Sequence, residues 1–249
     1  MTVRCRLGVT DRRGRDRPDG AAGDPRPRAV VRAHRRGGGL EMTTLLANAK
    51  LTLSLRVTGV RDDGFHLIDA EMVSLDLADE LEIEPADTSS LTVSGPFADG
   101  VPTDGSNLCL RALALAGRTA SVRLRKAIPH GGGLGGGSAD AAAVLRWAGV
   151  HDPVAASRLG ADIPFCLVGG RARVTGIGEI VEPLPTRRLD ITLVIPPLTS
   201  STPEVYAAWD ALGGPTGEGA NDLEVAAIAV TPDLTGWRDA IHERCGVAP

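Results

Sequence analysis

The run of glycines between His130 and Ser138 constrains this chain more than any other sequence feature. In "HGGGLGGGSADAAAVLRW", six glycines surround Leu134, and an alanine-rich helical pattern from about Ser138 to Trp147 follows directly. Glycine permits positive φ and lets backbone N–H groups approach a ligand closely. A helix start adds free N–H donors and the positive end of the helix dipole. The loop therefore predicts an anion site of the kind that holds phosphate groups.

Three other interpretations of the loop fit less well. A P-loop requires a Lys near its end, and Ser138 follows Gly137 here. A Rossmann loop can be forced onto Gly131, Gly133 and Gly136, but that loop opens the first βα unit, whereas this one follows several strand patterns. A flexible linker is the third alternative, and the strand and helix patterns that flank the loop argue against it.

Strand patterns dominate the first half of the chain and helical patterns the second half. We expect strands within 47–60, 67–86 with a break near Ala78 and Asp79, 91–94, 120–128 and 191–195. We expect helices after Asn107 or Ser106 as N-cap, over 138–147, over 202–212 with Thr202 as N-cap, and twice more after residue 214. A short helix, a turn and a strand pair fill 151–184. This order predicts an α+β fold.

Residues 1–41 differ in composition from the rest of the chain. They hold eleven Arg and five acidic residues, although the whole chain has a net charge of −4. A nucleic-acid-binding arm, a disordered Arg/Gly-rich extension and an upstream artefact of a misplaced start are three interpretations, and Met42 is the candidate start under the third. We expect an extension that binds no nucleic acid.

Cysteine spacing and hydropathy exclude several classes of protein. Cys5, Cys109, Cys166 and Cys245 are scattered without a CxxC pair, so neither a zinc site nor a disulfide framework is indicated. No apolar run is long enough for a membrane span, and the N-terminus lacks the apolar region of a secretory signal. We expect a cytoplasmic protein with reduced thiols and no membrane association.

Several ordered motifs resemble one family. "IPHGGGLGGGSADAA" resembles the phosphate-binding loop of the GHMP kinases, and "NAKLTLSL", "GFH", "LGADIPF", "TPEVYAAW" and "ANDLE" resemble segments of the members that act on a cytidine diphosphate-linked methylerythritol. The resemblance covers about Leu46 to Glu224. It implies ATP-dependent phosphorylation of the 2-hydroxyl of that small molecule, in the non-mevalonate route to isoprenoid precursors, with Mg²⁺ accompanying ATP.

The resemblance also implies a domain organisation. Residues 42–185 would form the N-terminal ATP-binding domain, similar to ribosomal protein S5 domain 2, and residues 186–249 a C-terminal α+β domain. The family's third glycine-rich motif has no counterpart after Glu243, so we expect this second domain to be truncated. Another GHMP small-molecule kinase and a catalytically impaired nucleotide-binding relative are the alternative functions. A monomer or a homodimer is expected.

Site residues follow from the resemblance, motif by motif. Lys50 and Asp162 match the catalytic Lys and Asp, and Asn107 matches an Asn near the nucleotide base. Phe65 and Tyr206 match two aromatic residues that stack on cytosine, and His66 the side chain that bonds its edge. Triphosphate binding falls to the loop residues Pro129, Gly131, Gly132, Gly133, Leu134, Gly135, Gly136, Gly137, Ser138 and Ala139. Ser138 is also expected to assist Mg²⁺. Two departures are Thr52, where Asn is usual, and Ala139, where a second Ser is common.

Overall fold

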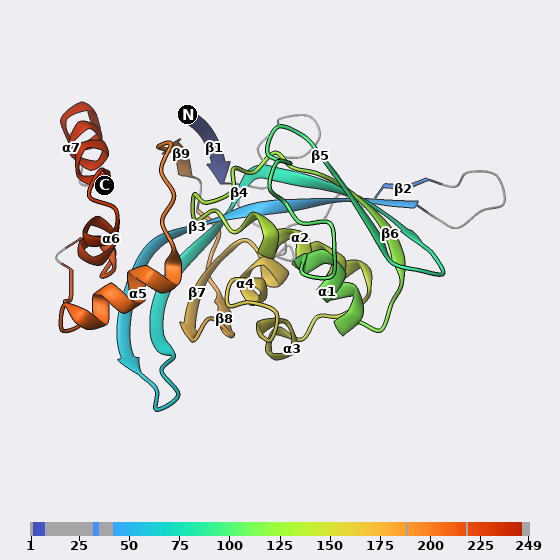
Figure 1. The fold of residues 1–249 in the computed structure, drawn as a ribbon, viewed down its shortest axis with the longest axis horizontal. Helices are drawn as coiled ribbons and strands as arrows, with labels where there is room; N and C mark the ends of the chain where they lie inside the picture. Colours follow the sequence, from blue (N-terminus) through green and yellow to red (C-terminus); the bar gives the residue numbers. More distant parts are fainter. Residues whose placement is uncertain (1, 8–31, 35–41, 188, 218, 246–249) are drawn as a thin grey trace.

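A computed structural model describes residues 2–7, 32–34, 42–187, 189–217 and 219–245 of the 249-residue chain. One mixed sheet and a two-stranded ribbon carry the helices (Figure 1). The strands are β1 (Thr2–Leu7), β2 (Arg32–His34), β3 (Met42–Val60), β4 (His66–Pro85), β5 (Ser90–Ser94), β6 (Ala120–Arg125), β7 (Arg171–Gly176), β8 (Ile180–Pro183) and β9 (Leu189–Val194). The helices are α1 (Leu108–Leu115), α2 (Gly136–Trp147), α3 (Pro153–Ser157), α4 (Ile163–Val168), α5 (Thr202–Ala211), α6 (Glu224–Val230) and α7 (Leu234–Cys245). The α+β class is confirmed.

The long antiparallel hairpin of β3 and β4 is the centre of the sheet. Its turn is the segment "RDDGFH", in which the Arg61 N–H donates to the Phe65 carbonyl over 2.8 Å and Gly64 has a φ of 84°. The expected break near Ala78 and Asp79 is wrong, because β4 runs without interruption from His66 to Pro85. The apolar pattern changes near Asp79 because β4 pairs with β7 before this point and with β6 after it.

Two different strands share one edge of β4. Residues Ile68–Val73 pair with β7 and residues Glu80–Pro85 pair with β6, both antiparallel. Among the described residues, no strand pairs with the segment between them on that edge. On the other side, β3 has an irregularity between Asn48 and Lys50. Loops that leave β6 and enter β7 thus reach the middle of the sheet, and the candidate site lies there.

Helices α1, α2 and α4 cover one face of the sheet (Figure 1). In α2 every residue from Ala139 to Leu145 is buried, and its alanines let the helix lie close to the strands and to α1 and α4. This helix starts at Gly136, two residues earlier than expected, so the last glycines of the loop are helical. The segment "IPFCLV" after Asp162 forms α4, a helix that the sequence patterns did not indicate.

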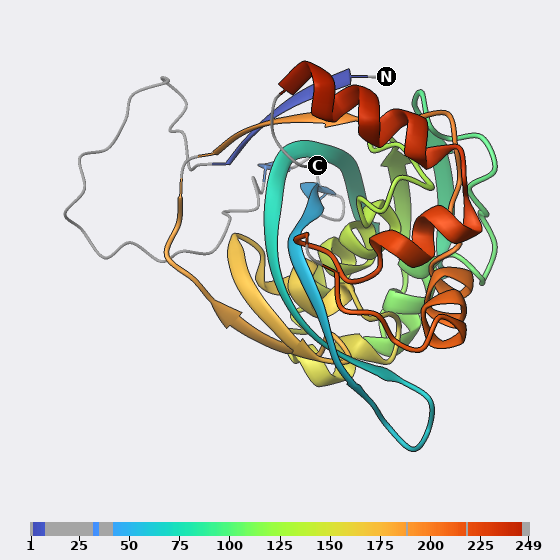
Figure 2. The same cartoon turned by 90° about the vertical axis from the view of Figure 1, so that its left-hand side faces the viewer.

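Helices α5 and α6 pack against the hairpin around Val57, and α7 contacts α6 (Figure 2). The expectation that Thr202 is the N-cap of α5 is wrong: Ser201 is the N-cap, and Thr202 is the first residue of the helix. The buried Asp222 carboxylate joins this region to β3: it accepts hydrogen bonds from Arg56 Nη1 at 2.7 Å and from the N–H groups of Val57 and Gly217, each at 2.9 Å. The "ANDLE" motif therefore has a structural role.

The N-terminal segment contains two of the described strands. Strand β1 pairs with β9, as Figure 2 shows, and β2 pairs with the start of β3. The expectation of disorder over residues 1–41 is therefore wrong for these two stretches, and the rest of that segment lies outside the described residues. Among the described helices, none is long and apolar enough to cross a membrane.

Substitution of Asp222 by Asn should lower the free energy of unfolding by about 1–3 kcal/mol at neutral pH. Burial alone would raise the pKa of Asp222, but the hydrogen bonds from Arg56, Val57 and Gly217 hold it below its ordinary value. A depressed pKa stabilises the fold above the unfolded value of about 3.9, and this contribution disappears as the pH falls through the folded-state pKa.

Urea unfolding of wild type and Asp222→Asn between about pH 7 and pH 2 checks this. The gap between the two proteins should narrow below about pH 4. Asp233→Asn, at an exposed acid in the same region, is the control. A gap that stays constant with pH would contradict the role given to the Asp222 charge.

Candidate active site

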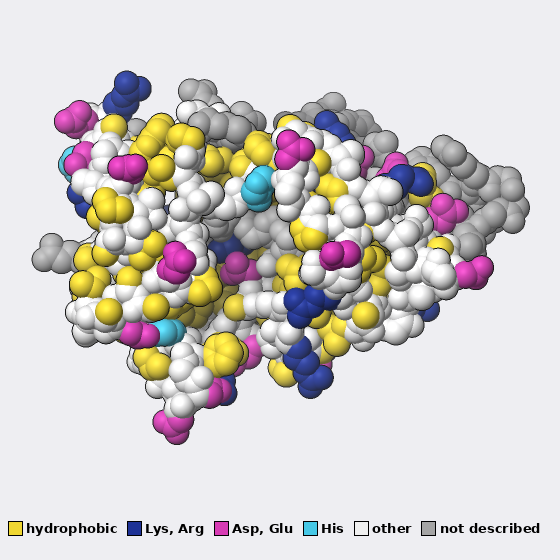
Figure 3. Space-filling model, in the orientation of Figure 1, with side chains coloured by type: hydrophobic (Ala, Val, Ile, Leu, Met, Phe, Trp, Pro, Cys, Tyr) yellow, Lys and Arg dark blue, Asp and Glu magenta, His cyan; other side chains and the backbone are white. Residues whose placement is uncertain are grey.

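A cavity of about 670 Å³ opens between the sheet, the glycine loop and helix α5. Figure 3 shows this face of the molecule hollowed at its centre, with a basic and an acidic side chain visible inside. Lys50, Thr52, Gly135, Ser138 and Asp162 are among its lining residues, and so are Phe65, His66, Tyr206 and Asp210. The structure thus brings together the expected catalytic pair and the three residues expected to bind a base.

Lys50 is placed by the irregularity in β3. Its backbone N–H is not used by a strand neighbour and donates instead to the Leu134 carbonyl of the glycine loop, at 2.9 Å. Its ammonium nitrogen lies 3.4 Å from Asp162 Oδ2 and donates to Thr52 Oγ1, also at 3.4 Å. The Lys50 side chain is 12% exposed and that of Asp162 34%, so both border the cavity. Thr52 therefore contributes to holding Lys50.

Asp162 lies directly before α4, and its backbone position is fixed on both sides. Its carbonyl accepts the N–H of Cys166 at 3.1 Å within the first turn of that helix. Gly178, in the segment "GIGE" (176–179), packs tightly against Ala161, the residue before Asp162, so that an added Cβ would lie 2.5 Å from the Ala161 carbonyl. The two motifs "LGADIPF" and "GIGE" are thus one packed unit that presents the carboxylate to the cavity.

The glycine loop lines a second cavity of about 300 Å³, which shares Gly133, Gly135 and Ser138 with the first. Gly131, Gly133 and Gly135 have φ values of 78°, 70° and 65°, a region that other residues rarely adopt. Gly135 caps α2 without any side-chain hydrogen bond, so N–H groups of the first turn remain free to bind an anion.

Leu134 and Ala139 differ from the other loop residues. The Leu134 side chain is buried in the core and anchors the loop. The Ala139 methyl is buried as well, and its N–H donates to the Gly135 carbonyl at 2.8 Å. The structure therefore gives Ala139 a helical role rather than a free donor, in contrast to its expected part in triphosphate binding. His130 is exposed.

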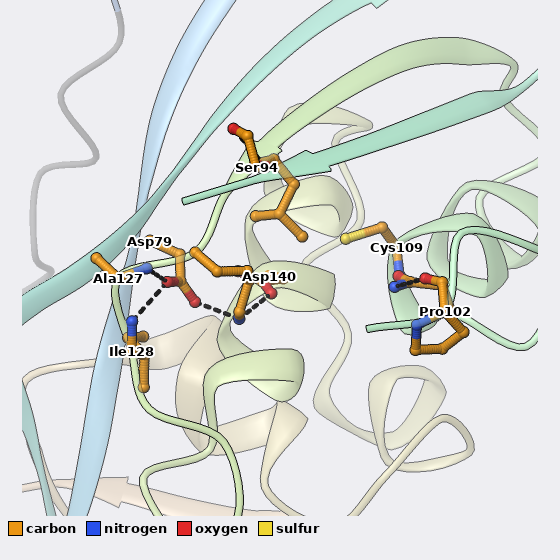
Figure 4. Close-up of polar contacts among 10 residues, drawn as sticks. Asp79, Ser94, Pro102, Cys109, Ala127, Ile128 and Asp140 are labelled. Atoms are coloured by element: carbon orange, nitrogen blue, oxygen red, sulfur yellow. Dashed lines mark hydrogen bonds and ion pairs between the residues drawn. The ribbon is translucent and has the colours of Figure 1, made fainter. Parts of the chain in front are cut away.

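A buried charged cluster beneath the loop was missed by the sequence analysis. Asp79 of β4 accepts hydrogen bonds from Lys126 Nζ through Oδ2 and from the Ile128 and Ala127 N–H groups through Oδ1 (Figure 4). Lys126 Nζ also donates to Asp140 Oδ2 of α2, at 2.7 Å. The cluster ties the segment before the loop and the helix after it to the same strand residue. The one available signal was that Lys126 is one of only two lysines.

Asp140 has an unusual environment within this cluster. Asp140 lies in the first turns of α2, and its side chain is 3% exposed. Burial raises the pKa of Asp140 to about 7, against the opposing attraction of the Lys126 ammonium, and the nearby Asp79 carboxylate adds to the rise. Its Oδ1 atom has no hydrogen-bond partner among the described residues. One lysine thus serves two buried carboxylates.

Aromatic rings gather where the hairpin turn meets α5. The His66 ring lies 4.5 Å from the Tyr206 ring at an interplanar angle of 33°, and its edge meets Trp209 at 5.6 Å. Burial raises the pKa of the Tyr206 hydroxyl, and the Asp162 carboxylate adds to the effect. Phe65 is 55% exposed at the cavity. An exposed aromatic beside a cavity is available to a planar ligand.

Asn107 is the N-cap of α1. Its Oδ1 accepts the Cys109 N–H at 2.8 Å and its Nδ2 donates to the Pro102 carbonyl at 2.8 Å (Figure 4). Both ends of the amide are therefore used within the protein, and Asn107 does not line either cavity. Contact with a nucleotide base stays a prediction for this residue.

Comparisons with known proteins agree on one family. The model of the GHMP kinases N terminal domain matches residues 107–170. A 4-diphosphocytidyl-2-C-methyl-D-erythritol kinase of Paracoccus denitrificans is 45% identical over 79% of this chain and 78% of its own length. One from Cereibacter sphaeroides is 40% identical over 82% and 84%. A crystal structure of 4-(cytidine 5'-diphospho)-2C-methyl-D-erythritol kinase superposes with a TM-score of 0.61 at 33% identity, covering 82% of this chain and 84% of that one.

Substitution of Lys126 by Met should lower the free energy of unfolding by about 3–5 kcal/mol, because Asp79 and Asp140 would lose their shared cation while staying buried. Urea unfolding measures the change. Arg125→Met is the control, since Arg125 is the adjacent residue and exposed. Equal stability of the two variants would contradict the role of the cluster.

Substitution of Gly135 by Ala should destabilise the protein more than Gly117→Ala. Both glycines have positive φ, 65° and 61°, so the backbone penalty of about 1 kcal/mol is shared. A Cβ at Gly135 would lie 2.7 Å from Lys50 Cγ, whereas one at Gly117 would meet nothing within 4 Å. Thermal unfolding of the two variants isolates the contact with Lys50, and equal midpoints would refute it.

Proposed function

Because this chain belongs to the 4-diphosphocytidyl-2-C-methyl-D-erythritol kinase family, we propose that it transfers the γ-phosphoryl group of ATP to the 2-hydroxyl of that cytidine diphosphate-linked methylerythritol. The chain is a kinase, and GHMP kinases use ATP. The observation that carries the proposal is the contact of Lys50 with Asp162 beside an open glycine loop, within one cavity.

Asp162 and Lys50 divide the chemistry between them. Asp162 accepts the proton of the substrate 2-hydroxyl. The oxygen of that hydroxyl bonds to the γ-phosphorus of ATP, and the bond from this phosphorus to the bridging oxygen of ADP breaks. Lys50 neutralises negative charge on the transferring group and keeps Asp162 oriented through the 3.4 Å ion pair. The support for these roles is that both groups border the cavity and face each other.

The glycine loop binds the triphosphate. Its free N–H groups and the positive end of α2 favour negative charge. The Lys126 ammonium beneath the first turn is paired with Asp79 and Asp140 and holds the loop in place. A Cβ at Gly135 would lie 2.7 Å from Lys50 Cγ, and one at Gly136 would lie 3.1 Å from Lys126 Nζ, so both positions require glycine for close packing. The smaller cavity, which both glycines line, is our proposed phosphate site.

Mg²⁺ fits this site as a companion of ATP rather than as a resident metal. The described residues contain no group of three His, Cys, Asp or Glu side chains that could hold an ion alone. Mg²⁺ commonly takes its ligands from substrate phosphates and water. The Ser138 hydroxyl, which lines both cavities, is the protein ligand that we propose. When bound, the ion neutralises phosphate charge.

The part of the larger cavity where the hairpin turn meets α5 would hold the cytosine. Phe65 and Tyr206 supply aromatic faces for the base, and His66 supplies ring nitrogens for its edge.

We propose a reducing, cytoplasmic setting for the reaction, which is supported by the free, buried thiols of Cys109 and Cys166.

Purified protein with Mg-ATP and 4-diphosphocytidyl-2-C-methyl-D-erythritol should release ADP in a coupled assay. Asp162→Asn should lower kcat by about 100-fold or more with a smaller change in KM, because it removes the base and not the binding contacts. Lys50→Met should also lower kcat strongly.

Asp99→Asn, at an exposed loop acid, is the matched control and should keep full activity. Wild-type ADP release that does not depend on the cytidine substrate would overturn the assigned substrate. An Asp162→Asn variant with unchanged kcat would overturn the assigned base.

A further inference from the structure

Asp210 of α5 makes a contact that the proposed reaction does not explain. Its Oδ1 atom lies 2.8 Å from Nε2 of His66, the first residue of β4. The two residues are 144 positions apart in the chain, and both line the larger cavity. Asp210 is half exposed, whereas the His66 side chain is 12% exposed.

The orientation of the His66 ring is fixed on several sides. Tyr206 packs against its face and Trp209 meets it edge to face, both on the same helix as Asp210. With Nε2 directed to Asp210, Nδ1 is the ring nitrogen that remains for a ligand in the cavity. None of the hydrogen bonds found among the described residues reaches Nδ1.

The carboxylate determines which nitrogen carries the proton. An ionised carboxylate can only accept hydrogen bonds, so Nε2 must be the donor in this contact. In a neutral imidazole the other nitrogen is then unprotonated and can only accept. His66 therefore offers a lone pair at Nδ1.

We propose that Asp210 is a positioning residue that fixes the His66 tautomer and thereby selects cytosine over uracil. Cytosine carries an amino donor at C4, where uracil carries a carbonyl acceptor, so an accepting nitrogen matches the first base and repels the second. This proposal rests on the proposed function, because it takes His66 as the group that meets the base edge.

A purely structural role for the contact predicts something different. Loss of a bridge between the hairpin turn and α5 would loosen the cavity and weaken the binding of both bases alike. Loss of the acceptor at Nε2 instead changes the ratio between the two bases. Base selectivity is therefore the readout that separates the two roles.

The test compares wild type, Asp210→Asn and Asp210→Ala, with Glu204→Gln as control at an exposed acid on the same helix. An Asn side chain can turn its NH₂ toward Nε2, which moves the ring proton to Nδ1. We expect Asp210→Asn to reduce the ratio of kcat/KM for the cytidine substrate to kcat/KM for its uridine counterpart by about tenfold. Glu204→Gln should keep the wild-type ratio.

Nitrogen-15 NMR provides a readout independent of turnover. Spectra at about pH 8.5, where imidazoles are generally neutral, should show the His66 proton on Nε2 in wild type, with the signal assigned by its loss in His66→Gln. A proton on Nδ1 in wild type would overturn the proposal. So would an Asp210→Asn variant in which KM rises equally for both substrates.

Calorimetry with CDP and UDP separates this inference from the proposed function. Wild type that binds CDP more tightly than UDP but does not phosphorylate the cytidine substrate would overturn the kinase assignment and support base selection. Wild type that turns over the cytidine and uridine substrates equally would overturn base selection and leave the kinase assignment standing.

Discussion

The Asp79 carboxylate is the group on which the geometry of the site depends most. Asp79 belongs to the central strand β4, and it holds the two N–H groups that precede the glycine loop together with Lys126, which in turn holds Asp140 on α2. A loop of six glycines pays a large entropic cost when it becomes ordered. Attachment of both its ends to one strand residue lowers that cost, because only the middle of the loop is left to order.

The same strand pair organises the proposed catalytic groups. Lys50 lies where β3 departs from regular pairing, and its N–H reaches the loop instead of β4. Asp162 lies directly before α4, and its carboxylate lies 3.4 Å from the Lys50 ammonium. Departures from regular sheet structure are thus concentrated at the site, as is common where backbone groups serve function.

Local patterns predicted most elements of this fold, because alternation and helical periodicity record which face is buried. The continuity of β4 through Asp79 was not predictable, since its apolar pattern changes where its partner strand changes. Lys50, Asp162 and the loop were identifiable because their motifs are local. The cluster around Lys126 and the contact of Asp210 with His66 join residues distant in sequence, so neither leaves a local pattern.

The hairpin also sets a length requirement on any molecule that fills the larger cavity. Lys50 and Thr52 line it midway along β3, whereas Phe65 and His66 line it where the hairpin turns. Under the proposed function, the number of strand residues between these points sets how far the acceptor hydroxyl lies from the bound base. Because side chains alternate between faces, a change of one residue in a regularly paired stretch would turn the lining side chains away from the cavity. A paired change of two residues in both strands would alter the span by about 7 Å and keep them facing inward.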